Sequence, residues 1–144
     1  MKSKEILALA RNTNTSDLVR EASNIRDKGH GSLITYSPKV FIPLTHLCRD
    51  VCHYCTFAKT PKKVSSPYMS IKEVVDSAKN AELLGCKEAL FTLGERPELR
   101  YSTARKALVT MGYSSTLEYL KDSSKAVIEN TEFLPHLNHG CMTF

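Results

Sequence analysis

Three cysteines, Cys48, Cys52 and Cys55, lie within eight residues of one another. Their Cys-x3-Cys-x2-Cys spacing places three thiolates on one short loop, which suits a cubane 4Fe-4S cluster. Four protein ligands would close every iron, whereas three leave one iron able to take a small ligand. The spacing therefore predicts an iron–sulfur site that does chemistry and is not only structural.

Two other interpretations of this array are open. Zinc sites combine cysteine with histidine, so His46 or His53 would serve as a fourth ligand, although the usual zinc pairs are spaced differently. A redox pair of Cys52 and Cys55 would leave Cys48 without a role, and the thioredoxin-like context of such a pair is missing. A cluster explains all three cysteines with one site.

The 144 residues are 42% hydrophobic and 24% charged, as expected for a soluble globular chain of about one domain. No apolar run approaches the roughly 18 residues of a membrane span, and the N-terminus lacks the apolar core of a signal peptide. We therefore expect a cytoplasmic protein, in which thiols stay reduced. The other two cysteines, Cys86 and Cys141, stand beside apolar neighbours and are expected to be small core residues.

The formal net charge of +5 comes from 20 Lys and Arg against 15 Asp and Glu. Three lysines, Lys59, Lys62 and Lys63, follow the cysteines and are expected to form a solvated face. Nucleic-acid binding would need a denser basic stripe with interleaved aromatic residues. We therefore expect neither a nucleic-acid partner nor a membrane.

Short helices are expected before the part of the chain that holds the cysteines. They cover residues 3–10 and 17–28, and Thr15 or Ser16 is expected to cap the second one. Together they form a helical N-terminal extension, residues 1–32.

The pattern then changes to that of strands and helices in alternation. Residues 33–47 are rich in β-branched and aromatic side chains, which predicts a strand that ends at the cysteine loop. Ser70 and Glu73 form a capping box that opens a helix. Residues 87–93 are a short apolar run that predicts a buried parallel strand, and residues 94–100 form the loop at its carboxyl end.

Two more helices, residues 103–111 and 116–129, follow this strand, the second behind a capping box of Ser115 and Glu118. A third strand is expected to begin at Phe133. This alternation predicts right-handed βαβ units, with active residues on loops at the carboxyl ends of the strands, as in an α/β barrel.

A complete barrel of this kind needs about 250 residues. We therefore expect residues 33–144 to be the N-terminal part of a barrel that is truncated at its C-terminus. Its last strand would have an open edge, so we expect the segment alone to aggregate and to be inactive.

The cysteine array, with aromatic Tyr54 directly before the last cysteine, resembles the signature of the radical S-adenosylmethionine (SAM) superfamily. The resemblance implies a partial (β/α) TIM-like barrel with two cofactors, a 4Fe-4S cluster on Cys48, Cys52 and Cys55, and SAM. The amino and carboxylate groups of SAM would chelate the open iron. In that family the reduced cluster passes an electron to SAM, and the resulting 5′-deoxyadenosyl radical abstracts hydrogen.

The flanking sequence is similar to the CofG subunit or domain of FO synthase over about residues 34–138. The similar segments are residues 41–45, 47–50, 54–58, 85–94, 97–101, 115–120 and 134–138. This resemblance implies a lyase of coenzyme F420 biosynthesis that cyclises an adduct of tyrosine and 5-amino-6-ribitylamino-uracil to the deazaflavin FO, with loss of ammonia. CofH, which makes the adduct, would be the functional partner, and an external reductant would supply single electrons. Radical SAM enzymes of the CofH or menaquinone-pathway type, and a non-catalytic iron–sulfur or zinc-binding fragment, are the alternatives.

By position, the resemblance gives Tyr54 a part in shaping the adenosine pocket. It gives the turn of Gly94, Glu95 and Pro97 a part in facing the amino group of SAM, and an ordinary proline turn is the alternative. No catalytic residue is assigned. Two charged residues either face this site or lie on the surface: Glu98 and Arg100. Three histidines stand where the resemblance leads us to expect other residues: His46, His53 and His139.

Overall fold

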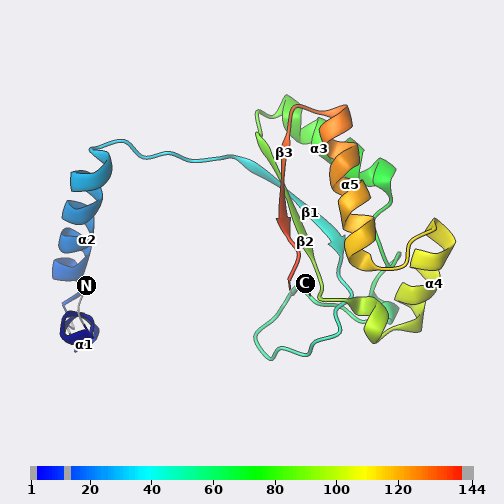
Figure 1. The fold of residues 1–144 in the computed structure, drawn as a ribbon, viewed down its shortest axis with the longest axis horizontal. Helices are drawn as coiled ribbons and strands as arrows, with labels where there is room; N and C mark the ends of the chain where they lie inside the picture. The colour runs from blue at the N-terminus through cyan, green and yellow to red at the C-terminus, as the bar shows by residue number, and fades with distance from the viewer. Residues whose placement is uncertain (1–2, 12–13, 141–144) are drawn as a thin grey trace. The chain divides into compact units, whose positions relative to one another are not determined.

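The computed structural model describes residues 3–11 and 14–140, and it divides into two compact units, Met1–Tyr36 and Ser37–Phe144 (Figure 1). The first unit holds the helices α1, Ser3–Arg11, and α2, Thr15–His30. No described residue of these two helices is buried. The apolar core of the chain therefore lies in the second unit.

Helix α2 begins two residues before the predicted start, and the prediction of its cap is wrong. The N-cap is Asn14, whose side-chain oxygen accepts hydrogen bonds from the backbone N–H groups of Ser16 (3.1 Å) and Asp17 (3.3 Å). Asn serves as well as Ser in this position because its short side chain reaches the same unpaired N–H groups.

A three-stranded parallel sheet forms the centre of the second unit. Its strands are β1, Lys39–Thr45, β2, Glu88–Leu93, and β3, Leu134–Asn138, and they lie in the order β1–β2–β3. Both pairings are parallel. The predicted α/β class, with a parallel sheet built from strands and helices in alternation, is confirmed.

The helices of the second unit connect these strands. α3, Ile71–Leu83, joins β1 to β2, whereas α4, Ser102–Met111, and α5, Thr116–Asn130, join β2 to β3. Two short 3-10 turns, η1 at Pro61–Lys63 and η2 at Pro97–Leu99, lie in the loops. α3 and α5 lie side by side on one face of the sheet (Figure 1).

Both predicted capping boxes mark a helix start, but only the first is complete. In α3, Ser70 Oγ accepts from the Glu73 N–H (3.2 Å), and the Glu73 carboxylate accepts from the Ser70 N–H (2.7 Å). In α5, Ser115 Oγ accepts from the Glu118 N–H (3.2 Å), whereas the Glu118 carboxylate accepts from Ser114. These hydrogen bonds lower the pKa of both glutamates.

The strand predicted over residues 33–47 is shorter in the structure, because β1 pairs with β2 only from Lys39 and Glu88 onward. A strand forms only where a neighbour can take its backbone hydrogen bonds. The apolar side chains of the predicted first part therefore stay exposed, with exposed fractions of 72%, 69% and 88% for Leu33, Ile34 and Tyr36.

The core lies between the sheet and the helices α3 and α5. Alternate residues of β1 and β2 point into it and are fully buried, because successive side chains of a strand point to opposite faces. They are Ile42, Leu44, Ala89 and Phe91. Helix residues complete the cluster, among them Val74, Ala78, Leu120 and Val127. This packing fixes the carboxyl ends of β1 and β2, where the loops of the candidate site begin. Within the described residues, no helix is long and apolar enough to span a membrane.

Candidate metal centre

The cysteine loop leaves the sheet at the carboxyl end of β1. Thr45, the last residue of that strand, is buried, and its hydroxyl donates to the carbonyl of Pro67 (2.7 Å). The same hydroxyl accepts from the backbone N–H of Leu47 (3.1 Å), whose side chain lies in the core. The exit of the strand is therefore fixed just before the first cysteine.

Cys48 is held by the turn that follows β2. Its Sγ accepts hydrogen bonds from the backbone N–H groups of Glu95 (3.2 Å) and Asp50 (3.4 Å). Two backbone N–H groups therefore point at the sulfur of the first predicted ligand. The fold thus brings together two segments 47 residues apart in the sequence at the first predicted ligand.

Gly94 allows the turn and the loop to approach this closely. A Cβ at this position would lie only 1.9 Å from the carbonyl oxygen of Leu47. The Gly94 N–H donates to the carbonyl of Thr45 (3.0 Å), and the Arg49 N–H donates to the carbonyl of Glu95 (2.8 Å). Two stretches of backbone are therefore joined side by side, and only glycine fits between them.

Glu95 and Pro97 belong to the same turn. The Glu95 side chain is 10% exposed, and its carboxylate lies 3.9 Å from Arg49 and 3.5 Å from Arg96. Arg96 has a left-handed backbone (φ 30°), and Pro97 is buried at the start of η2. The predicted cofactor residues Gly94, Glu95 and Pro97 thus form one turn beside the first cysteine, and their contact with SAM stays a prediction.

Cys48, Cys52 and Cys55 line one cavity of about 240 Å³. A backbone hydrogen bond from the Cys55 N–H to the Cys52 carbonyl (3.1 Å) joins the later two, which are exposed, whereas Cys48 is half-buried. Within residues 3–11 and 14–140, however, no three His, Cys, Asp or Glu side chains lie close enough together to hold a metal ion. The structure brings the predicted ligands to one cavity but does not bring their thiols into a ligand geometry.

The chemistry of this donor set fits a 4Fe-4S cluster. All three cysteines are free thiols, and the two exposed ones lie on a stretch of loop that is open to solvent. N–H donors to a ligating sulfur are one of the means by which proteins tune a cluster. Cys48, Cys52 and Cys55 would hold the group.

Arg100, one of the two charged residues left open by the sequence, faces the site. Its guanidinium donates to the carbonyl of Arg49 (3.1 Å) and lies over the ring of Tyr101, 5.1 Å from its centroid. Arg100, Tyr101 and Lys59 all line the cavity of the cysteines. Two cations and the carboxylate of Asp50 therefore line the cavity of the three cysteines.

Glu98, the other charged residue left open by the sequence, bonds instead to the start of α5. Its carboxylate accepts from the N–H (3.2 Å) and the hydroxyl (2.6 Å) of Thr116. Because the one proton of this hydroxyl goes to Glu98, the Tyr68 hydroxyl donates to Thr116 Oγ1 (2.7 Å). Burial raises the pKa of Tyr68, and the Glu98 carboxylate adds to this, so the donor stays protonated. The turn is thereby tied to α5 and to the segment after the loop.

The remaining predicted residue, Tyr54, has a side chain that is 89% exposed. The part in the adenosine pocket that the resemblance assigns to it concerns its backbone, and it stays a prediction. His53, between the later two cysteines, is likewise exposed.

His46 has a part in the site that sequence reasoning missed. Its Nδ1 lies 3.0 Å from the carbonyl oxygen of Phe57, and the two rings pack with centroids 4.5 Å apart. The Lys59 N–H donates to the carbonyl of His46 (2.8 Å). His46 thus closes the base of the cysteine loop. The only signal in the sequence was that His46 and Phe57 each lie two residues outside the array.

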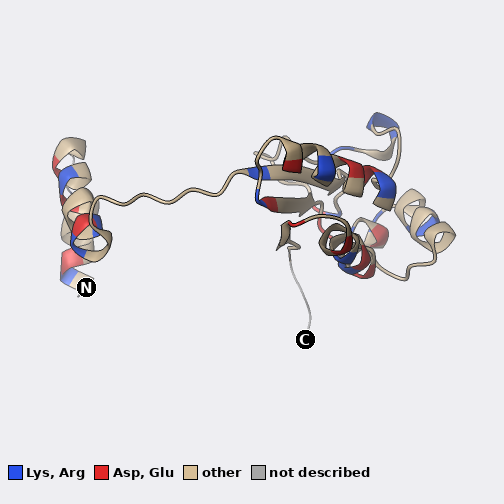
Figure 2. Ribbon diagram, turned by 90° about the horizontal axis from the view of Figure 1, so that it is seen from above, with Lys and Arg blue, Asp and Glu red and all other residues tan. Residues whose placement is uncertain are grey.

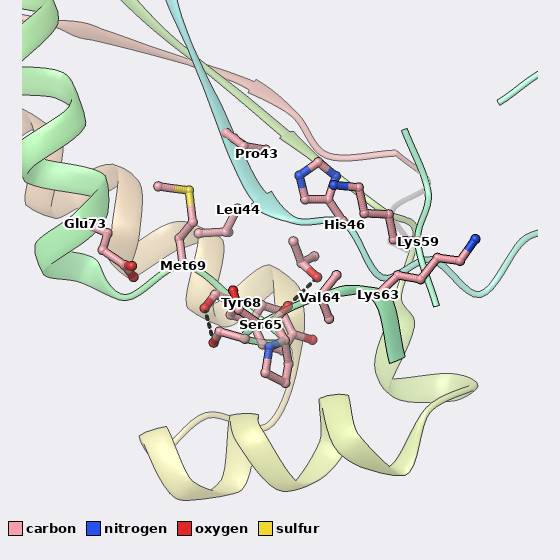
Figure 3. A pocket seen from close by; sticks show the side chains of 13 residues that line it. Pro43, Leu44, His46, Lys59, Lys63, Val64, Ser65, Tyr68, Met69 and Glu73 are labelled. Atoms are coloured by element: carbon pink, nitrogen blue, oxygen red, sulfur yellow. Dashed lines mark hydrogen bonds between the residues drawn. The ribbon is translucent and has the colours of Figure 1, made fainter. Parts of the chain in front are cut away.

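A second cavity, of about 300 Å³, lies between the end of β1 and the segment that follows the loop (Figure 3). That segment is held to β1 by a hydrogen bond from the Met69 N–H to the Leu44 carbonyl (2.9 Å). It is held to α5 by the Tyr119 hydroxyl, which donates to the Met69 carbonyl (2.6 Å). Both ends of the cysteine loop are therefore anchored to the same core.

Among solved structures, the chain is similar to the FeFe-hydrogenase maturase HydG from Carboxydothermus hydrogenoformans, a radical SAM protein. The TM-score is 0.64 at 25% sequence identity, and the match covers 94% of this chain and 28% of that one. No protein-family profile matches the chain. The fold is thus that of part of a radical SAM α/β barrel, as the sequence predicted.

Sequence comparison with curated proteins finds relatives among the FO synthases. The chain is 49% identical over 148 residues to the FO synthase of Nocardia farcinica, and the match covers 96% of this chain and 17% of that protein. It is 50% identical over 111 residues to the 7,8-didemethyl-8-hydroxy-5-deazariboflavin synthase of Methanopyrus kandleri, covering 77% of this chain and 33% of that protein. The chain is a relative of the FO synthases and matches one segment of them.

Proposed function

We propose that the chain carries the iron–sulfur site and part of the SAM site of a radical SAM FO synthase of the CofG type. Cys48, Cys52 and Cys55 are the cluster ligands in this proposal. When bound, the cluster and SAM would supply one-electron chemistry that protein side chains lack. The observation that carries the proposal is the cysteine loop itself, which lines one cavity and is held by the turn after β2.

For the whole enzyme, we propose ring closure of the adduct of tyrosine and 5-amino-6-ribitylamino-uracil to FO, with release of ammonia. The printed name of the Methanopyrus relative, a synthase of this deazaflavin, supports the choice. CofH would make the adduct, an external reductant would supply single electrons, and the reaction would take place in the cytoplasm. The rest of the length of the relatives would complete the substrate pocket.

The chain's own residues would prepare this site for its cofactors. Arg100 and Lys59 add positive charge to a cavity that Asp50 also lines, and this charge would attract the negative charge of a thiolate-ligated cluster. Gly94 keeps the turn close to the loop, and Glu98 holds that turn from the side of α5. Such support keeps the first ligand in place while the exposed part of the loop adapts to the cluster.

Anaerobic reconstitution with iron and sulfide tests the cluster. We expect about four iron and four sulfide per chain, because three thiolates hold three corners of a cubane. Cys48→Ala, Cys52→Ala and Cys55→Ala should each abolish it. Cys86→Ala removes a half-buried thiol outside the loop and is the matched control that should retain it. Stoichiometric zinc that resists exchange for iron would overturn the proposal.

Addition of SAM to the reduced cluster tests the open iron. The electron paramagnetic resonance spectrum should change, because the amino and carboxylate groups of SAM would bind the iron directly. A spectrum unchanged at saturating SAM, in this chain and in a longer protein that spans the full length of its relatives, would contradict the proposal. A substrate assay of the longer protein with CofH present separates FO synthesis from other radical SAM reactions.

A further inference from the structure

The cysteine loop and the segment that follows it carry an excess of positive charge. Residues 46–70 carry four Lys or Arg and one Asp, whereas the rest of Ser37–Phe144 carries ten basic and ten acidic residues. Along α3 and α5, the two signs of charge are interspersed (Figure 2), whereas α4 carries basic residues only. The segment that contains and follows the cysteines therefore has a net charge of +3, and residues 96–106 of the same unit have the same net charge.

Three exposed lysines, Lys59, Lys62 and Lys63, supply most of this charge, and we call them the lysine rim. In the part of the chain that the structure describes, none of the three has an ion-pair partner. Three of the unit's seven other lysines are paired in the described residues: Lys39 with Glu88, Lys72 with Asp76 and Lys125 with Glu129. The charge of the lysine rim is thus left available to another molecule.

The backbone holds the lysine rim beside the site. The Lys59 N–H donates to the carbonyl of His46 (2.8 Å), and the Lys63 N–H donates to the carbonyl of Thr60 (2.9 Å) and closes η1. Lys59 also lines the cavity of the cysteines. Figure 3 shows Lys59 near His46, and both Lys59 and Lys63 line the second cavity. A molecule that binds the lysine rim would therefore lie next to the cluster site.

Two apolar side chains are exposed on the cysteine loop itself. The exposed fractions of Val51 and Tyr54 are 72% and 89%. An apolar centre with a polar border is the usual anatomy of a protein–protein interface, and tyrosine is prominent among the residues that contribute most to binding. This combination suits a protein partner better than a small anion.

We propose that the lysine rim, together with Val51 and Tyr54, docks an acidic protein that delivers single electrons to the cluster. The inference rests on the proposed function, because it gives the cysteine loop a cluster to reduce. In each transfer the reduced cofactor of the donor loses one electron and the cluster gains it, and no bond is made or broken. Opposite charges raise the association rate of two proteins, and charge placed beside the site also orients the partner.

A matched pair of double variants tests this surface. Lys62→Glu/Lys63→Glu reverses two charges of the lysine rim that do not line the cysteine cavity. Lys79→Glu/Lys87→Glu makes the same change in net charge at two exposed lysines outside residues 46–70. The probe is an acidic flavodoxin, whose flavin fluorescence reports binding to each full chain without any need for a cluster.

We expect the variant of the lysine rim to bind at least about tenfold more weakly at low salt, and the control variant to bind like the unmodified chain. The difference should shrink toward about 1 M salt, where the Debye length is only about 3 Å. The rate at which flavodoxin reduces the reconstituted cluster should likewise be lower in the variant of the lysine rim than in the control variant and the unmodified chain. Reduction by dithionite, which needs no docking, should change far less.

Equal losses in both double variants, or a loss in neither, would overturn the docking surface. Tighter binding of a DNA or RNA oligonucleotide than of flavodoxin would also overturn it, since the surface would then serve nucleic acid. Failure of the unmodified chain to assemble a cluster would count against the proposed function instead. The fluorescence comparison would still judge the docking surface in that case.

Discussion

The cysteine loop and the sheet that carries it are held in different ways. Leu44 and Phe91 are fully buried beneath helices, so apolar packing sets the ends of β1 and β2. Cys52 and Cys55 are exposed, whereas backbone N–H donors hold Cys48, the first cysteine of the array. The chain's own packing thus fixes where the loop begins and ends and leaves two thiols at the surface. Binding of a metal group commonly orders the residues that ligate it. Here only the exposed part of the cysteine loop is left to be ordered in this way, because both ends of the loop are already fixed.

The largest effect is expected from a substitution that destabilises the sheet and leaves the cysteine loop unchanged. Phe91→Ala should lower the free energy of unfolding by about 3–5 kcal/mol, because it removes a fully buried aromatic side chain from the core. Cys52→Ala and Cys55→Ala should change it by less than about 0.5 kcal/mol in the cluster-free chain. Urea unfolding followed by circular dichroism measures all three.

Phe41→Ala is the control on the same sheet, because the Phe41 side chain is 52% exposed. Its loss should be a small part of that for Phe91→Ala. Equal losses for the two phenylalanine variants would show that the helix-covered face is not the core that holds the loop.

A second substitution, Gly94→Ala, would break the junction between the two regions. The new methyl group would meet the Leu47 carbonyl oxygen, which is backbone and has little room to move. We expect a loss of about 1–3 kcal/mol in the free energy of unfolding. We also expect faster reaction of Cys48 with a thiol reagent, because the Glu95 N–H would move away from its sulfur.

Gly112→Ala is matched to this change, since Gly112 has φ 86° and nothing within 4 Å of an added Cβ. Its cost is backbone strain of about 1–2 kcal/mol, with no effect on the reactivity of Cys48. A Cys48 reactivity that is unchanged in Gly94→Ala would mean that the turn does not hold the first ligand.

Local signals made most of the fold predictable from the sequence. The box of Ser70 and Glu73 is a contact between neighbours, so its residue types alone marked the start of α3. The length of β1 was not predictable in this way, because it depends on where β2 lies. Ile34 and Tyr36 have strand-like side chains but no strand beside them. Pairing overrode propensity there.

The cysteines of the candidate site could be predicted from their spacing in the sequence. The contacts that folding makes between distant residues could not be predicted. The array of three cysteines is contiguous in the sequence and needs no fold to be noticed. The contact between Arg100 and Arg49 joins residues 51 apart, and that between Glu98 and Thr116 joins residues 18 apart. Nothing in the local sequence says which of two neighbouring charged residues, Glu98 or Arg100, will face the cysteines.

A smaller effect is expected from a substitution that weakens the hydrogen bonds between α5 and the turn after β2. Thr116→Val removes the hydroxyl that joins Tyr68 to Glu98 and leaves both groups short of a partner. We expect a loss of about 1.5 kcal/mol in the free energy of unfolding, the lower end for a hydrogen bond to a charged group. Thr110→Val, at an exposed position of α4, is the control and should be close to neutral. A Thr116→Val chain as stable as the control would show that this chain of hydrogen bonds does not hold the turn.

The smallest effect lies at the amino end of the sheet, away from the loop, where ion pairs replace apolar packing. Lys39, with Ser37 and His136, holds the pKa of Glu88 down to about 2 from its ordinary 4.5. The ionised carboxylate is therefore favoured by folding. Its contribution to stability is fully present above pH 4.5 and is lost as the pH falls toward 2.

Glu88→Gln should therefore flatten the dependence of unfolding free energy on pH between 4.5 and 2, relative to the unmodified chain. Lys39→Gln removes the largest cause of the low pKa of Glu88, so the loss of stability should be smaller and should be complete at a higher pH. Urea unfolding at a series of pH values measures both, and reaction of Cys48 with a thiol reagent should not change in either variant. Identical pH profiles for Glu88→Gln and the unmodified chain would show that this carboxylate is not held by its neighbours. A change in Cys48 reactivity would show that the two ends of the sheet are coupled, which the separate anchoring of the loop at its carboxyl end does not predict.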